Sequence, residues 1–324
     1  MPDEAAKSLI RVLFLLALQV TLTPSALACV NDYVPNHKAI AASRSLAEEL
    51  TKEELIEPWA TRRDRLRKEV QAGGDYKVRN DLASALMHTG DAQTAIQILE
   101  EIEKSEPGLY QTASNLGTAY ELAGKNENAL EWIRKGIERN PKSHDSSEWI
   151  HVKILEAKIA QDKNTDLPAD GSILGLHFDF SSRPKQPPTL PAGNSGEVLT
   201  MDQIEAGLKY QLHERLQFVK APDLIVASLL LDLGNIIALK SGSHGAAQGI
   251  YEFASSYMPP DQEDTLLKGR ILHCQKLAHL ANMKHSFFAD PVQFTVSMAI
   301  LGVIALYVLL KIRDYRRKCM ARNP

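Results

Sequence analysis

Four positions with small or helix-ending residues recur along the chain at one fixed interval of 34 residues. They are Ala83 and Gly117, Gly90 and Gly124, Ala95 and Ala129, and Pro107 and Pro141. Leu82 and Leu116 repeat at the same interval. Self-similarity at a fixed period of this length is typical of stacked supersecondary units that share one continuous core. The repeat constrains the fold more than composition does, because each unit must fit against its neighbour.

The residue types at these positions suit two packed helices in each unit. In the second unit, Gly117 lies where the first helix presses on the second, so a larger side chain would separate them. Gly124 ends the first helix, at a turn where a left-handed backbone favours glycine. Ala129 lets the following unit approach, and Pro141 ends the second helix. In the first unit, Asp91 follows the turn glycine and is predicted to cap the next helix.

A 34-residue unit of two helices resembles the tetratricopeptide repeat. The resemblance rests on the leucine–small pair, the turn glycine, the alanine and the closing proline, and Tyr120 matches the usual aromatic position. Leu86 and Gly136 depart from the pattern. The resemblance implies an all-α fold of α-solenoid-like helical hairpins over residues 75–162, made of two repeats and a closing helix. It also implies a scaffold that binds a protein or peptide and does no catalysis.

In that family the first helix of each unit lines a concave face that binds extended or helical peptides. Mostly small, uncharged polar residues fall at the corresponding positions, which we expect to be exposed and to bind a partner. They are Lys77, Asn80, Ser84, Met87, Gln111, Ser114, Asn115, Thr118 and Glu121. Amides and hydroxyls both donate and accept hydrogen bonds, which suits a peptide backbone. Only Lys77 is basic, so a free C-terminal carboxylate is not expected to be required. The alternative is that this face packs against the chain's own N-terminal helices or second half.

Further helices are predicted on both sides of the repeats. Residues 29–74 form an N-terminal helical segment with a break at Pro58. A closing helix follows the second repeat. Residues 163–199 are rich in proline and glycine and are expected to be a linker, extended as polyproline II in part.

A second helical region is predicted over residues 200–285. It begins at Thr200 and Gln203, which form a capping-box pattern. Gly234 follows a leucine, as Gly117 does. The small and turn residues after Gly234 lie one position further along the chain than their equivalents after Gly117. Those residues are Ala247, Ala254 and Pro259. A single inserted residue in the turn explains the offset, so we predict a diverged third repeat; the alternative is an unrelated helical hairpin.

The N-terminus has the layout of a signal peptide over residues 1–28. Lys7 and Arg11 precede an apolar run that ends before Ala26 and Ala28, the small residues of a cleavage site. A buried helix and an uncleaved anchor are the alternatives, although the run is short of the ~20 residues of a span. Cys29 follows the cleavage site, and the residues before it depart from the lipoprotein pattern. Whether Cys29 is lipidated or disulfide-bonded stays open.

The C-terminus has the layout of a transmembrane helix. Residues 292–310 are 19 residues without a charge, which as a helix span about 28 Å, close to the ~30 Å hydrocarbon core of a bilayer. A basic tail follows at 311–324, and basic flanks stay in the cytoplasm. A buried core helix is the alternative. Together the two ends predict a single-pass protein of the bacterial inner membrane, with its bulk in the periplasm and its tail in the cytoplasm.

The remaining residues point to no chemistry. The three cysteines and ten histidines show no metal-ligand spacing, so no metal or cofactor is expected. The Ser241–Gly245 stretch lacks the spacing of a nucleophile elbow. The net charge of −3 does not favour nucleic acid, and no small-molecule substrate is indicated. The sequence predicts a non-enzymatic, membrane-tethered scaffold for a periplasmic protein or peptide; the alternative is a structural subunit of an envelope assembly that contacts partners through its transmembrane helix. The partner and the oligomeric state stay open.

Overall fold

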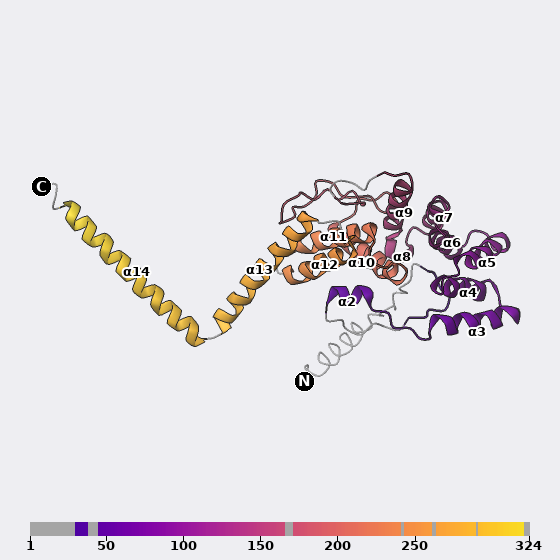
Figure 1. Ribbon diagram of the computed structural model, residues 1–324, viewed down its shortest axis with the longest axis horizontal. Helices are drawn as coiled ribbons and strands as arrows, with labels where there is room; N and C mark the ends of the chain where they lie inside the picture. Colours follow the sequence, from indigo (N-terminus) through magenta and orange to yellow (C-terminus); the bar gives the residue numbers. More distant parts are fainter. Residues whose placement is uncertain are drawn as a thin grey trace, which may run out of the picture.

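The computed structural model describes residues 30–37, 45–165, 171–240, 243–260, 264–289 and 291–320. These residues form thirteen helices and no strand, in agreement with the predicted all-α class. Figure 1 shows the helices in three groups: a repeat region, a second helical region beside it, and an arm. The predicted signal peptide and Cys29 lie outside the described residues.

Two helical hairpins form the centre of the repeat region. The first pairs α4 (Tyr76–His88) with α5 (Ala92–Ser105), and the second pairs α6 (Tyr110–Leu122) with α7 (Asn126–Arg139). The backbone at Gly90 and Gly124 is left-handed, with φ of 84° and 72°, and the carboxylate of Asp91 accepts a bond from the backbone of Thr94. Gly117 faces Ile133 of α7, whose side chain a methyl group at that position would overlap. These contacts explain the spacing of the small residues.

Helix α3 (Trp59–Gln71) precedes the hairpins, and Pro58 stands at its N-cap. Two helices follow them: the short α8 (Ser143–Ser146) and the closing α9 (Glu148–Asp162). A continuous apolar cluster runs from α3 to α9 and includes Leu66, Leu86 and Ile133. The first described residues, 30–37, are not helical, although they belong to the segment 29–74 that was predicted to be helical. They form an irregular stretch with bends at Val30, Tyr33 and Val34 and an isolated bridge from His37 to Leu55.

The second helical region consists of α10 (Met201–Phe218), α11 (Leu224–Leu239), α12 (His244–Tyr257) and α13 (Thr265–Ala289), with α2 (Leu46–Thr51) packed against α10 and α12. The capping box predicted at Thr200 and Gln203 is present at the start of α10. Gly234 of α11 faces the ring of Tyr251 on α12. This partner lies 17 residues on, whereas Ile133 lies 16 residues after Gly117, which is the offset that one inserted residue produces.

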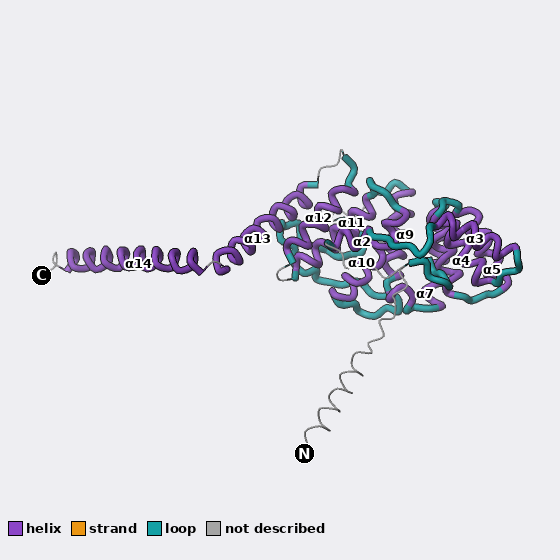
Figure 2. The backbone as a smooth tube through the Cα atoms, turned by 90° about the horizontal axis from the view of Figure 1, so that it is seen from below, coloured by secondary structure: helices purple, strands orange, loops and turns teal. Residues whose placement is uncertain are grey.

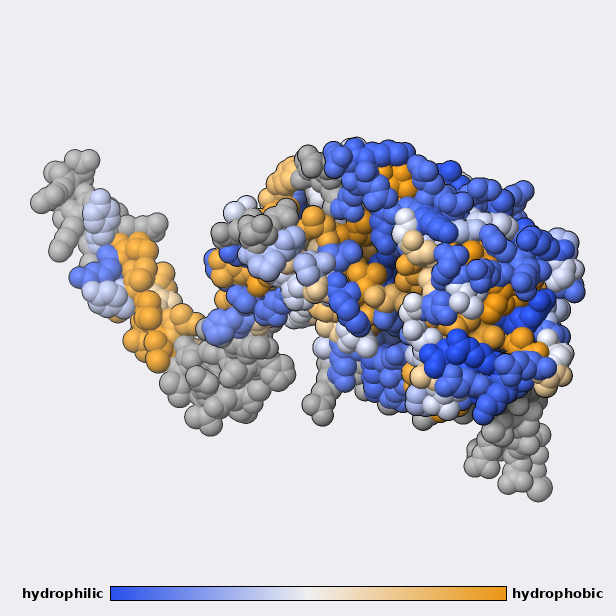
Figure 3. Space-filling view, turned by 45° about the vertical axis from the view of Figure 1, so that its right-hand side comes forward, coloured by the Kyte–Doolittle hydropathy of each residue, from blue (hydrophilic) through white to orange (hydrophobic). Residues whose placement is uncertain are grey.

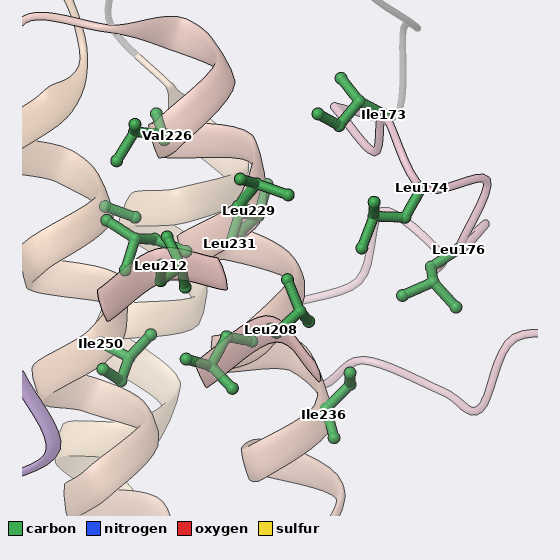
Figure 4. Packing of buried hydrophobic residues seen from close by; sticks show 14 of the residues in the cluster. Ile173, Leu174, Leu176, Leu208, Leu212, Val226, Leu229, Leu231, Ile236 and Ile250 are labelled. Carbon is green, nitrogen blue, oxygen red and sulfur yellow. The ribbon is translucent and has the colours of Figure 1, made fainter. Parts of the chain in front are cut away.

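The segment predicted as a linker is part of the core. Ile173, Leu174, Leu176 and Phe178 are buried in the same apolar cluster as α10, α11 and α12. Figure 4 shows three of these side chains directed toward the helices from an irregular loop. Since burying apolar side chains is favourable, the loop is held against the helices and does not act as a free spacer.

The arm is α14 (Pro291–Met320), which leads away from the body beyond α13 in both views. Its described side chains from Met298 to Leu310 include a series of exposed apolar residues, seen as the orange stretch in Figure 3. Among the residues that the structure describes, no helix meets the length and hydropathy of a membrane span. The side chains of residues 291–294 and 296–297, where the predicted span begins, lie outside the described ones.

Candidate functional site

The predicted concave face is largely buried, so the expectation of exposure is wrong for most of it. Lys77 is exposed and Gln111 is half-buried. Six others are buried: Asn80, Ser84, Met87, Ser114, Asn115 and Thr118. Glu121 is the ninth position, and its side chain is only 7% exposed. Two parts of the same chain cover the face, a non-helical N-terminal segment at one end and α10 at the other.

The N-terminal segment is Val30–Val34, called here the docked segment; it is not helical and bends at Val30, Tyr33 and Val34. The Asn115 side chain contacts both polar groups of residue Asn31: its Oδ1 accepts from the Asn31 N–H at 2.7 Å, and its Nδ2 donates to the Asn31 carbonyl at 3.2 Å. Asn80 donates to the same carbonyl at 2.6 Å and accepts a bond from Asn115 at 2.9 Å. Two asparagines from neighbouring repeats therefore hold one residue of non-helical backbone.

A carboxylate and a guanidinium hold the rest of the docked segment. Asp81 of α4 accepts from the backbone N–H of Tyr33 at 2.7 Å and from that of Val34 at 2.9 Å. Arg62 of α3 donates to the carbonyl of Val34. The same guanidinium lies 3.3 Å from Asp32 and 3.4 Å from Asp81. One buried cation therefore stands between two buried carboxylates.

This arrangement changes the ionisation of the two acids. Burial, reinforced by the nearby charge of Asp81, raises the pKa of Asp32 to about 7, although Arg62 opposes the shift. Burial also raises the pKa of Asp81, against the bonds from the docked backbone and the charge of Arg62. Since the proton-bound form of Asp32 is favoured in the docked state, the segment docks more firmly at acid pH than at alkaline pH.

Besides Asp32, two side chains of the docked segment contact the repeat region. Val30 is buried in the apolar cluster of the repeats. The ring of Tyr33 meets that of Tyr76 edge to face, with centroids 5.7 Å apart, and the ammonium of Lys77 lies 5.7 Å from the Tyr33 centroid. Val34 is exposed. The segment therefore offers one apolar anchor and one aromatic contact, and most of its attachment comes from backbone hydrogen bonds.

The other end of the face is closed by α9 and α10 through Glu121. Its carboxylate accepts two bonds from Arg215, at 2.9 and 3.2 Å. His151 Nε2 lies 2.7 Å from it, and Lys158 Nζ lies 2.6 Å from it. The cavity between these side chains measures about 40 Å³ and is too small for a bound peptide. We call Glu121, His151, Lys158 and Arg215 the Glu121 cluster.

Charge compensation within the Glu121 cluster is strong. Burial works to raise the pKa of Glu121, but Arg215, His151 and Lys158 together lower it well below its usual value. For His151, burial works to lower the pKa, yet the bonds to Glu121 and Glu148 raise it. The cluster therefore acts as a polar link between the second repeat and the region that begins at α10.

Sequence reasoning identified the two asparagines but not the charged groups that act with them. Arg62, Asp81 and Arg215 lie at no repeat-defining position, and their partners are remote along the chain; Arg215 and Glu121 are 94 residues apart. The feature of the sequence that could have revealed these groups is a charged residue inside an otherwise apolar helical face. Among the described residues, no three His, Cys, Asp or Glu side chains are placed to hold a metal ion, and Cys274 is buried as a free thiol.

Comparison with known proteins agrees with the architecture of the second hairpin. Residues 110–143, which span α6 and α7, match the family described as tetratricopeptide repeat. No significant match to a curated protein or to a solved structure was found. The chain is thus a helical protein with a tetratricopeptide repeat at residues 110–143, a kind of unit that suggests a scaffold for protein–protein interaction.

Proposed function

We propose that this protein is a non-enzymatic scaffold that binds a non-helical segment of a partner polypeptide across α4 and α6. One observation carries the proposal: these helices already hold a non-helical stretch of backbone, with Asn80 and Asn115 bonded to the N–H and the carbonyl of Asn31. Contacts to the backbone need no particular side chain, which is the property expected of a peptide-binding face. Because the face is occupied in cis, a partner binds by displacing the docked segment.

We further propose that the scaffold is tethered to the bacterial inner membrane by residues 292–310, with its bulk in the periplasm and its basic tail in the cytoplasm. Support comes from the exposed apolar side chains of α14, among them Val303, Leu306 and Leu309. A row of this kind rarely faces water and marks a membrane or protein contact. Lys311 and Arg313 come next, as expected for the cytoplasmic end of a span.

Site-specific photo-crosslinking in native membranes tests the scaffold. A photoreactive residue at Lys77, which is exposed beside Tyr33, is expected to give an adduct with a partner polypeptide. The matched control places the same residue at Glu127, exposed on α7 and away from the docked segment. Equal adducts from both positions, or none from Lys77, would count against the groove as the binding face.

The alternative function is a structural subunit of an envelope assembly that contacts its partners through α14. The observation that favours it is the same exposed apolar row, which is available to partner helices as well as to lipid. Deleting residues 292–310 separates the two functions. Capture of the partner by the remaining chain supports the scaffold, whereas its loss supports the structural subunit.

A further inference from the structure

The contacts that hold the docked segment resemble those of a bound peptide more than those of a core helix. Of residues 30–37, only Val30 and Asn36 are buried as whole residues, together with the carboxylate of Asp32. The attachment of Asn31, Tyr33 and Val34 comes mainly from backbone hydrogen bonds. Each such bond replaces one with water and contributes little net free energy. A segment held in this way can exchange with a competing chain, whereas a core helix cannot.

The contacts to backbone define the shape of the competing chain. The competing chain must offer a backbone N–H donor at the positions equivalent to Asn31, Tyr33 and Val34. It must also offer a backbone carbonyl acceptor at the positions equivalent to Asn31 and Val34. Proline is therefore excluded at three of the five positions, because it has no N–H. The bonded groups all belong to peptide units and none to a chain terminus. The ligand is an internal stretch whose backbone bends at the equivalents of Tyr33 and Val34.

The contacts to side chains define its sequence class. The first position is buried among apolar residues, as Val30 is. The third faces Arg62, which Asp81 already neutralises, so a polar residue that can bond without a second full charge fits best. The fourth meets Tyr76 edge to face and lies near Lys77, and both contacts favour an aromatic ring. The side chain at the fifth position, Val34, is exposed, so the only requirement there is that the residue is not proline.

We propose that the groove recognises, in a partner polypeptide, an internal segment with the pattern apolar, any residue but proline, aspartic acid or asparagine, aromatic, any residue but proline, and that Val30–Val34 is a resident copy of this motif. This specificity rests on the proposed function. A cavity of about 360 Å³ continues from Tyr33 and Val34 along α3 and α4, between Arg65, Glu69 and Lys77. It gives room for a ligand longer than the docked segment.

Peptide binding to the full-length chain in detergent tests the motif. The probe is a fluorescein-labelled peptide with the sequence of residues 30–37, followed by fluorescence anisotropy. Val30→Asp places a charge in the apolar site and releases the resident segment without changing the groove. We expect this variant to bind the peptide at least tenfold more tightly than the unaltered chain, in which the resident copy competes. A scrambled peptide is the control for sequence.

Adding Asn115→Ala to Val30→Asp is expected to weaken binding at least tenfold, because two backbone bonds are lost. Asn128→Ala in the same background is the matched control; Asn128 is exposed on α7, and its removal is expected to change binding less than twofold. If Val30→Asp no longer melts cooperatively, Asp32→Arg serves instead, since a second cation beside Arg62 also expels the segment.

The motif is refuted if a folded, opened variant binds the peptide no better than the scrambled control, or if Asn115→Ala has no effect. Failure of the motif and failure of the scaffold are distinguishable. Photo-crosslinking from Lys77 in membranes without binding of this peptide leaves the scaffold in place and removes only the sequence class. Binding of this peptide without any crosslinked partner keeps the sequence class and counts against the scaffold.

Discussion

The strongest single test of how the repeats are joined to the second helical region is Glu121→Gln. The substitution keeps the shape of the side chain and removes its charge. The guanidinium of Arg215, which is only 8% exposed, then loses the carboxylate that accepts two of its bonds, while Lys158, at 24% exposed, recovers part of its hydration. Removing one partner of a buried ion pair costs about 3–5 kcal/mol. The exposure of Lys158 places the expected loss at the lower end, at about 3 kcal/mol.

A loss of that size is measurable by thermal melting. For a domain of this size class, each kcal/mol shifts Tm by about 2–4 °C, so the expected shift is about 6–12 °C. The control is Glu127→Gln, whose carboxylate is 75% exposed and pairs with Lys163 at 3.2 Å. An exposed pair of this kind is expected to change stability by less than about 0.5 kcal/mol.

The sign of the pH dependence gives a second check on the same variant. Because the folded pKa of Glu121 is lowered from its usual 4.5, its contribution is fully present above pH 4.5 and is lost as pH falls through the lowered value. The difference in melting temperature between the unaltered chain and the Glu121→Gln variant should therefore become smaller at acid pH. Replacing Arg215 by Met in the Glu121→Gln chain should restore part of the loss, since the buried guanidinium that lost this carboxylate is removed as well. A melting temperature within about 2 °C of the Glu127→Gln control would refute the reasoning.

Other predictions follow from features already described. Gly117→Ala is expected to destabilise the chain by about 1–3 kcal/mol in urea unfolding despite the better helix propensity of alanine, and Ile133→Val should recover part of this loss. The folded pKa of Asp32 is raised from 3.8 to about 7, so docking is firmest below pH 3.8 and weakens as pH rises through 7. Asp32→Asn should reduce this pH dependence in the amide exchange of Tyr33, after correction for intrinsic rates; the part that remains belongs to Asp81, which accepts the Tyr33 N–H and whose pKa is also raised. Cleavage is expected before Cys29, and the intact mass of the membrane-extracted chain decides it; a chain that still begins at Met1 would contradict the signal peptide. Protease added outside spheroplasts should digest the repeats, and their protection would contradict a periplasmic location.

Local features of the fold were predictable because their physical causes are local. The turn at Gly124, the cap at Asp91 and the capping box at Thr200 each depend on residues within one helical turn. The close approach at Gly117 was predictable because a 34-residue period fixes which helices face each other. The same reasoning placed Gly234 at a contact, with the offset that one inserted residue requires.

What the sequence did not predict depends on contacts between remote parts of the chain. The polar residues on α4 and α6 were expected to face solvent, and nothing in their own helices shows that residues 30–34 and α10 cover them. Composition suggested a free linker over residues 163–199, although Leu174 and Leu176 are buried. Backbone hydrogen bonds leave no mark on the sequence of the docked segment. Pairs such as Glu121 and Arg215 become visible only once the helices are placed in space.

The docked segment also sets an order of events in folding. Asn31 is synthesised first, yet its two partners, Asn80 and Asn115, lie 49 and 84 residues further along the chain. Contacts at such separations form late, because the loop between them must close before they stabilise anything. The groove of a newly made chain is therefore complete before its resident occupant arrives, and a partner present at that moment meets an open site. Pulse-labelling hydrogen exchange should show the Asn31 amide protected after those of α4 and α6; simultaneous protection would contradict this order.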